Sequence, residues 1–182
     1  RGEMGELDLY VSCDFSKPEA IATALLPYQD QLLAITCRSE KSMARFAQVI
    51  PHVSYLHVPT TDSLRWASDK YMMRKRFKIY DPAITPKFTL IKENTKEERA
   101  RIAKKIGFPM IIKPTNLAAS LFVSICYHEE DLVKTLQTTL RKINKAYEND
   151  NRLEEPKLIA EEYMDGDMYP IDPYVNAYEV VV

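Results

Sequence analysis

The stretch that decides the fold is Lys104-Lys105-Ile106-Gly107-Phe108-Pro109-Met110-Ile111-Ile112-Lys113-Pro114. It predicts the basic end of a helix, a Gly-Phe-Pro turn and a short buried strand. Burying an unpaired ammonium costs far more than its methylenes return, so Lys113 marks the point where this strand leaves the core, and Pro114 prevents the ladder from continuing. A lysine there, followed by a small-residue loop ending at Ser120, is an arrangement that holds a phosphate. The alternative is an ordinary surface lysine after an edge strand.

The composition narrows the classes of protein. The chain has 182 residues with 25 Lys and Arg against 26 Asp and Glu, so its charge gives no reason to expect nucleic acid or an anionic membrane as a partner. No apolar run reaches the roughly 18 residues of a membrane span. Three cysteines lie far apart without a Cys-x-x-Cys pair, which indicates free thiols in a reducing cytosol and hence a cytoplasmic location. The chain opens without methionine and closes on the apolar run 179–182, so we expect it to be a piece of a longer protein.

Residues 1–65 have the pattern of a parallel α/β unit. Strands are expected at 7–13, 31–37 and 53–58, and helices at 18–26 and 42–48. Alternation of strands and helices at this spacing is typical of a parallel sheet. The first strand is not followed by Gly-x-Gly-x-x-Gly, which argues against a dinucleotide-binding role. Residues 60–63 are interpreted as a polar break before the second part of the chain.

The second part, residues 66–182, alternates strands with longer helices. Asp69 caps a helix on which Lys70 and Arg74, at i and i+4, can point at one target. A helix beginning near Thr95 has a capping-box start and ends at Gly107. The remaining elements are strands at 87–91, 110–113, 123–127 and 157–162, a helix at 129–147, and a hairpin formed by 168–175 and 178–182.

Three motifs stand in a fixed order: Asp69-Lys70 with Arg74, then Gly107-Phe108-Pro109 leading to Lys113 and Ser120, then Ala160-Glu161-Glu162-Tyr163-Met164-Asp165-Gly166. Together they resemble the ATP-grasp superfamily, which includes D-alanine–D-alanine ligases, biotin carboxylases and amino-acid ligases. The resemblance covers roughly residues 65–182. It implies an α/β fold in which a Rossmann-like pre-ATP-grasp domain (1–65) precedes the first lobe of an ATP-grasp domain and the first hairpin of its second lobe (66–182).

The resemblance also implies a site in which ATP lies between two antiparallel sheets. Lys113 and Lys70 would contact the α- and β-phosphates, and the loop 115–122 would close over the β- and γ-phosphates with Ser120 donating to them. Paired lysines suit this task because they neutralise a polyphosphate. The resemblance further implies that Glu161 accepts from the adenine amino group or its surroundings.

The adenine edge would be read by the backbone of Glu162 and Met164. The position that commonly binds the ribose is Met168 here, so either a one-residue shift brings Asp167 to the ribose or the contact is absent. The loop 115–122 also departs from the family because it contains no glycine. The resemblance implies Mg²⁺ as well, with ligands expected beyond residue 182.

The leading interpretation is the ATP-binding portion of a ligase that activates an unidentified carboxylate as an acyl phosphate, for attack by an amine or similar nucleophile. The alternatives are a biotin-carboxylase-like enzyme that activates bicarbonate, and a non-catalytic nucleotide-binding or interaction module. Without second-lobe metal ligands, the 182-residue chain alone is expected to turn over no ATP. We also expect self-association through the apolar C-terminal strand.

Overall fold

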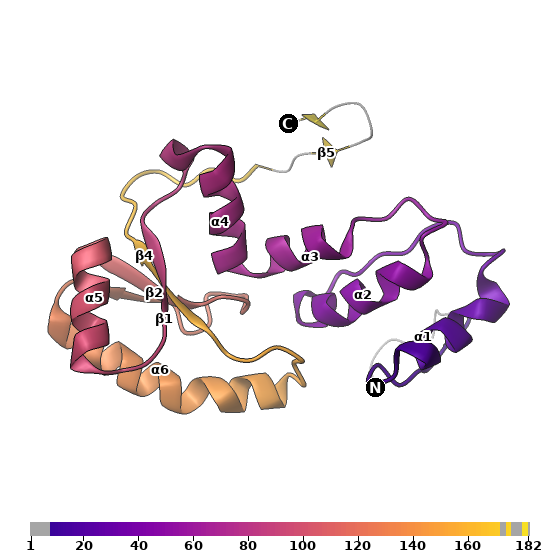
Figure 1. The fold of residues 1–182 in the computed structure, drawn as a ribbon, viewed down its shortest axis with the longest axis horizontal. Helices are drawn as coiled ribbons and strands as arrows, with labels where there is room; N and C mark the ends of the chain where they lie inside the picture. The colour runs from indigo at the N-terminus through magenta and orange to yellow at the C-terminus, as the bar shows by residue number, and fades with distance from the viewer. Residues whose placement is uncertain (1–7, 172–173, 176–179, 182) are drawn as a thin grey trace.

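The computed structural model describes residues 8–171, 174–175 and 180–181 (Figure 1). Three α-helices come first: α1 (Pro18–Leu25), α2 (Met43–Val49) and α3 (Thr61–Ser68). They are followed by α4 (Lys70–Tyr80), β1 (Phe88–Ile91), α5 (Lys96–Ile106), β2 (Met110–Pro114), β3 (Ser124–Cys126), α6 (Glu129–Asn149) and β4 (Leu158–Glu162). Short 3₁₀ turns lie at Leu26–Tyr28, Glu40–Ser42, Ile50–His52 and Pro82–Ile84, and β5 (Tyr174–Val175) pairs with β6 (Val180–Val181).

The first part of the chain differs from the prediction. Residues 8–87 form helices, turns and irregular segments but no strand, so the strands expected at 7–13, 31–37 and 53–58 are wrong wherever they are described. Leu7 lies outside the described residues. Several apolar side chains of the first two segments stay open to solvent, since Leu33 is 93% and Tyr10 68% exposed, whereas Val53 of the third is buried. A strand needs a neighbour to satisfy its backbone groups, and none lies beside these segments. The Rossmann-like unit is therefore not confirmed, whereas α1 and α2 are.

Residues 60–63 are the start of a helix and not a break. Thr60 is the N-cap of α3, and its side chain accepts a hydrogen bond from the backbone N–H of Ser63 at 3.1 Å. The α3 helix then leads directly into α4, whose N-cap is Asp69. The expected polar break is therefore the capping sequence of α3.

The sheet that carries the second part is antiparallel, with strand order β1-β4-β2-β3. Residues alternate between its two faces. One face packs against α5 and α6, and Figure 1 shows both helices gathered on that side of the strands. The helix-facing core contains Ile102, Ile106, Met110, Ile112, Leu132, Leu136, Ile143 and Ala160. The strand and helix predictions for residues 87–162 are confirmed to within a few residues.

The other face of the sheet is only partly covered. The register places Ile111 and Lys113 of β2 on this face, together with Ile159 and Glu161 of β4. The α4 helix lies against the β1 edge of the same face, where the Tyr71 ring meets the Phe88 ring edge-on at a centroid distance of 5.7 Å. No helix in the described part of the chain is long and apolar enough to cross a membrane.

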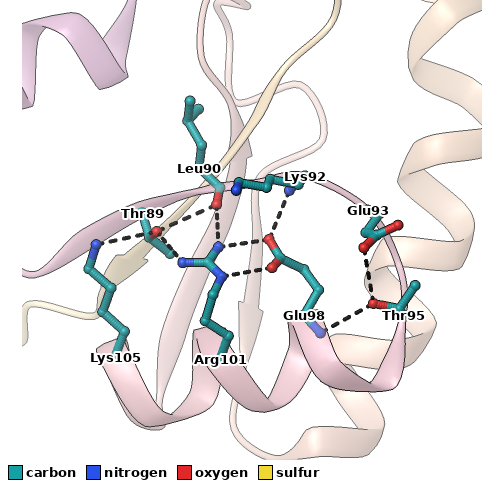
Figure 2. Close-up of polar contacts among 8 residues, drawn as sticks. All are labelled: Thr89, Leu90, Lys92, Glu93, Thr95, Glu98, Arg101 and Lys105. Atoms are coloured by element: carbon teal, nitrogen blue, oxygen red, sulfur yellow. Dashed lines mark hydrogen bonds and ion pairs between the residues drawn. The ribbon is translucent and has the colours of Figure 1, made fainter.

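A polar network fixes α5 to β1 (Figure 2). The Arg101 guanidinium donates to the Glu98 carboxylate at 2.7 Å and to the Leu90 carbonyl at 2.8 Å. The same carboxylate accepts from the Lys92 backbone N–H at 2.9 Å, and Thr95 caps the helix by accepting from the Glu98 N–H at 3.2 Å. Buried Glu98 is thus satisfied on both sides and joins the end of β1 to the first turn of α5.

This network predicts a pH-dependent stability. The hydrogen bond from Arg101 lowers the pKa of Glu98 to about 2, against an ordinary value of 4.5. Its stabilisation is therefore complete above pH 4.5 and is lost as the pH falls toward 2. A charge-assisted bond contributes about 1.5–3 kcal/mol, and because Arg101 is 39% exposed we expect Glu98→Gln to cost the lower figure at pH 7.

Denaturant unfolding at pH 7, 4.5 and 3 tests this expectation. The difference between the wild-type and Glu98→Gln chains should shrink at the lowest pH. Glu97→Gln is the matched control because Glu97 is exposed and shares the first turn of α5, and so the same helix dipole. A Glu98→Gln penalty that stays constant across the pH range would contradict the assignment.

Candidate functional site

The centre of the site is the carboxylate of Glu161, which three elements approach. Arg74 of α4 donates through Nε to Oε1 at 2.9 Å and through Nη2 to Oε2 at 3.4 Å. The Nζ atom of Lys113, on β2, lies 2.6 Å from Oε2. The Glu161 side chain is only 3% exposed, and those of Arg74 and Lys113 are 13% and 19% exposed. These three residues are called the Glu161 cluster below.

Local structure explains why the cluster forms. Ile111 of β2 is paired with Glu161 and Lys113 with Ile159, so Lys113 and Glu161 are diagonal neighbours on one face of adjacent strands. Arg74 reaches them because Asp69 caps α4 by accepting from the Met72 N–H at 3.0 Å. Lys113 was expected to mark the point where β2 leaves the core. Its side chain is instead mostly buried, and its charge is paired with Glu161 inside the cluster. Pro114 still belongs to β2 and is its last residue.

The electrostatics follow from burial and pairing. Burial by itself raises the pKa of Glu161, but hydrogen bonds from Arg74 and Lys113 outweigh it and leave this pKa below its ordinary value. Glu161 is therefore an anion at neutral pH. Burial lowers the pKa of Lys70, and repulsion from Lys113 lowers it further. Arg74 and Lys113 thus place two cations on one carboxylate, while Lys70 lies nearby and is also attracted by Glu40 and Asp69. The local excess of positive charge at Glu161 suits an anionic ligand.

Lys70 connects the cluster to the loop 115–122. Its Nζ donates to the carbonyl of Leu117 at 2.8 Å, and its backbone N–H donates to the carbonyl of Thr115 at 2.7 Å. Lys70 and Arg74 are one turn apart on α4, so the helix presents one cation to the loop and the other to Glu161. The predicted basic pair thus lies on α4 as expected, but its two cations have different partners and do not point at one target.

The base of the loop is firmly held. The Thr115 N–H donates to the Lys157 carbonyl at 3.0 Å, and the Arg152 Nη1 donates to the Asn116 carbonyl at 2.8 Å. The Tyr147 hydroxyl, near the end of α6, is hydrogen-bonded to Oδ1 of Asn116. Burial raises the pKa of Tyr147 to about 12, so this hydroxyl stays protonated. The sequence analysis missed Tyr147 and Arg152, because neither belongs to a motif.

The tip of the loop has an uncommon backbone. Ala119, Ser120 and Phe122 have φ values of 54°, 56° and 58°, in the left-handed region that favours glycine. The loop therefore has no glycine at positions whose backbone conformation favours one. Ser120 is exposed, as is Leu121 beside it. The N–H groups of Leu121 and Val123 donate to the Ala118 and Ser120 carbonyls at 3.2 and 3.1 Å, so the tip is held by turns of its own backbone.

The other predicted site residues lie at the end of β4 and beyond it. The Glu162 carboxylate accepts from the Lys87 N–H at 3.1 Å and lies 3.6 Å from the Lys87 Nζ. Met164 is 62% exposed, and Asp167 is exposed as well. Within the described structure, Ser120, Met164 and Asp167 form no side-chain hydrogen bond or ion pair with the Glu161 cluster. Met168, the alternative ribose position, is 96% exposed.

A metal centre needs several ligating side chains close together. Among residues 8–171, 174–175 and 180–181, no three His, Cys, Asp or Glu side chains gather closely enough to hold a metal ion. Glu161 is occupied by two cations, so it does not suit a divalent ion either. The ligands of the Mg²⁺ that the resemblance implies were expected beyond residue 182, so this finding does not test that expectation.

Comparisons with known proteins bear on the family and fold of the chain. Residues 106–182 match the family model of the ATP-grasp domain. A search of curated protein sequences found no significant match. The chain is similar in structure to an L-amino acid ligase from Bacillus licheniformis, with TM-score 0.59 and 14% identity, over 83% of this chain and 33% of that one.

Two further structures are similar. The first is a carboxyaminoimidazole ribonucleotide synthase from Aspergillus clavatus complexed with ATP, with TM-score 0.58 and 17% identity, over 87% of this chain and 37% of that one. The second is the biotin carboxylase domain of the 2-oxoglutarate carboxylase from Hydrogenobacter thermophilus, in complex with MgADP, ADP and bicarbonate. Its TM-score is 0.55 and its identity 22%, over 81% of this chain and 31% of that one. These identities show a shared fold alone, and the chain spans about a third of the length of each structure. The family match confirms the resemblance inferred from the motifs over residues 106–182.

The Glu161 cluster predicts a coupling energy. Arg74→Met leaves the buried carboxylate with Lys113 alone, and we expect it to lower the free energy of unfolding by about 1.5–3 kcal/mol, the value of a hydrogen bond to a charged group. In the Arg74→Met/Glu161→Gln double variant the two penalties should not add, because each removes the same interaction. Urea unfolding of the wild type, both single variants and the double variant measures the coupling. Full additivity would show that Arg74 and Glu161 act independently. Lys78→Met, at an exposed position of α4, is the control.

The loop tip predicts a stabilising substitution. A left-handed conformation costs an L-residue about 1–2 kcal/mol, and glycine loses part of this advantage through its larger conformational freedom in the unfolded chain. We expect Ala119→Gly to raise the free energy of unfolding by about 0.5–1 kcal/mol. Ala118→Gly is the matched control, because Ala118 does not have a positive φ. The expectation fails if both substitutions destabilise the chain equally in thermal or urea unfolding.

Proposed function

Because residues 106–182 match the ATP-grasp domain, we propose that the chain binds ATP through the Glu161 cluster and Lys70 and supplies the nucleotide-binding part of a ligase. The ligase activates a carboxylate as an acyl phosphate, which an amine or similar nucleophile then attacks. The observation that carries this proposal is the excess positive charge of Lys70, Arg74 and Lys113, on the open face of the sheet and beside the loop 115–122.

The polyphosphate is the ligand group that this charge fits best. Lys113 and Lys70 bind the α- and β-phosphates in the proposal, and Arg74 holds Glu161 in place when Lys113 turns toward a phosphate oxygen. Point charges on flexible stems suit this exchange of partners, whereas the planar guanidinium of Arg74 suits the fixed pairing with Glu161. The low exposure of the cluster strengthens each interaction because water screens it less.

The loop 115–122 closes over the β- and γ-phosphates in this proposal. Its anchored base and its left-handed tip support the assignment, since the backbone N–H groups near Ala119 and Ser120 can donate to phosphate oxygens while the base stays in position. The hydroxyl of Ser120 donates as well. The exposed Leu121 makes the loop more apolar than a glycine-rich one, which helps to exclude water from the bound phosphates.

In this proposal the adenine lies near the C-terminal end of β4. A carboxylate offers about four lone-pair positions, and Arg74 and Lys113 use three of those on Glu161, which leaves one for the adenine amino group. The backbone of Glu162 and Met164 reads the adenine edge. Because the Glu162 N–H already donates to the Lys87 carbonyl at 2.9 Å, its carbonyl is the group available to the base. Asp167 is assigned to the ribose.

Two alternatives remain under the same fold. One is a biotin-carboxylase-like enzyme that activates bicarbonate, and the other is a nucleotide-binding module without catalysis. The absence of glycine from the loop 115–122 favours the module, because a strained, bulky loop closes less readily. The retained cations favour the ligase. ATP-dependent phosphate release by the full-length protein with a panel of carboxylates, compared with bicarbonate, separates the three.

The test of the site is ATP binding by Lys113 variants. A charge-assisted contact contributes about 1.5–3 kcal/mol, so Lys113→Ala should weaken ATP binding by roughly 10- to 150-fold. Adenosine lacks phosphates, and its affinity should barely change. Because Lys113→Ala also removes a partner of Glu161, Lys70→Ala is measured alongside it and should weaken ATP in the same direction.

The control is Lys104→Ala, an exposed lysine in the last turn of α5. Calorimetric titration with ATP and adenosine compares the variants, and circular dichroism confirms that each is folded. Equal ATP affinity for Lys113→Ala, Lys70→Ala and Lys104→Ala would refute the phosphate assignment.

A further inference from the structure

We propose that a second cleft, separate from the Glu161 cluster, binds a small molecule that carries a diphosphate or a phosphate ester. The cleft has a volume of about 530 Å³ and lies between α4, the turn at Pro82–Ile84, the start of β1 and the end of α5. Four lysines line it: Lys75, Lys78, Lys87 and Lys105. It is called the lysine cleft below. Its volume is within the range of sites for small organic ligands.

The charge of the lysine cleft is one-sided. Among the described residues, no Asp or Glu lines it, although the chain as a whole carries nearly equal numbers of acidic and basic residues. Lys87 has a weak partner, the exposed Glu162 carboxylate 3.6 Å away. In the described ranges no carboxylate lies within 4.0 Å of the Nζ atoms of Lys75, Lys78 or Lys105. Four ammonium groups with a single weak carboxylate partner give the cleft a positive charge, which an anion neutralises.

Helix dipoles account for only part of this arrangement. Lys78 and Lys105 stand in the last turns of α4 and α5, where a cation is favoured by the dipole. Lys75 lies earlier on α4, and Lys87 precedes β1, so neither position has that explanation. The convergence of four lysines from three elements on one cleft is the feature that points to a ligand.

Two neutral features define the chemistry of the ligand further. The Thr85 hydroxyl is buried without a hydrogen-bond partner in the described structure, and Thr85 lines the cleft. Buried hydroxyls are nearly always hydrogen-bonded, and this one can donate to a phosphate oxygen. The rings of Tyr71 and Phe88 form an apolar wall, with the Lys75 Nζ 5.7 Å from the Tyr71 ring centre. A ligand with a phosphate group next to a small apolar group can contact both the Thr85 hydroxyl and the aromatic wall.

The lysine cleft shares no residue with the Glu161 cluster, so this proposal stands without the proposed function. Lys105 points away from α5 toward β1, where its Nζ donates to the Thr89 hydroxyl at 3.4 Å (Figure 2). Its neighbour Lys104 is also exposed and stands in the same last turn, but it does not line the cleft. The pair gives a matched comparison in which the helix dipole is constant.

The test is calorimetric titration of the chain with inorganic pyrophosphate at low ionic strength. The Lys78→Ala/Lys105→Ala double variant should bind pyrophosphate about 5- to 20-fold more weakly than the wild type, because each exposed contact contributes a modest, salt-screened amount. Lys104→Ala should bind as the wild type does. Lys113→Ala should lose only the pyrophosphate binding that belongs to the proposed ATP site. It should keep the binding that depends on Lys78 and Lys105, and this difference separates the two sites. Thr85→Val tests the hydroxyl and should weaken binding without changing its dependence on salt.

Three results would overturn the proposal: no pyrophosphate binding by the wild type, an equal loss in Lys104→Ala and the double variant, or a loss confined to Lys113→Ala. A second titration compares phenyl phosphate with inorganic phosphate. Tighter binding of phenyl phosphate that depends on Lys78 and Lys105 identifies an organic ester as the ligand class, and equal binding identifies the inorganic ion.

Discussion

The buried carboxylate of Glu161 is the constraint on which the rest of the second part depends. A buried anion is tolerated only when cations and hydrogen bonds compensate for its lost hydration. Here the compensation comes from Arg74 on α4 and Lys113 on β2, so satisfying one side chain brings a helix and two strands together. The strand register and the cap of α4 are both set so that these groups meet. The same compensation concentrates positive charge on the open face of the sheet, which is what the proposed nucleotide site requires.

The accuracy of the sequence predictions varied along the chain for physical reasons. The helix α5 was predicted correctly because its capping box and final glycine are local signals, and β2 and β4 because their apolar runs are short and bounded. The strands expected before residue 60 were wrong because alternation indicates a possible strand but not the presence of a partner. α3 was missed because Thr60 was interpreted as part of a loop, although a threonine can equally cap a helix.

The site was only partly accessible from the sequence. Lys70 and Arg74 could be placed on one helix face because their spacing is local, and the family motifs indicated Lys113 and Glu161. The pairing of Arg74 with Glu161 joins residues 87 positions apart. A sequence pattern such as hydrophobic periodicity predicts only local structure and cannot indicate this contact. The lysine cleft could not be predicted for the same reason, since its lysines lie on α4, on α5 and just before β1, and only the fold brings these segments together. The expected self-association through the C-terminal strand concerns residues that lie mostly outside the described part.

The contacts at Asn116 have a mechanical consequence. The chain leaves the base of the loop at Asn116, passes through β3, enters α6 directly after it, and returns to Asn116 through Tyr147. Residues 116–147 therefore form a ring closed by a side-chain hydrogen bond, and a helix of 21 residues, about 30 Å long, is its stiff segment. Movement of the loop tip leaves this ring intact, whereas movement of the loop base must bend or tilt α6. A ligand that displaces the base of the loop therefore also acts on the C-terminal end of α6, through the Tyr147 contact.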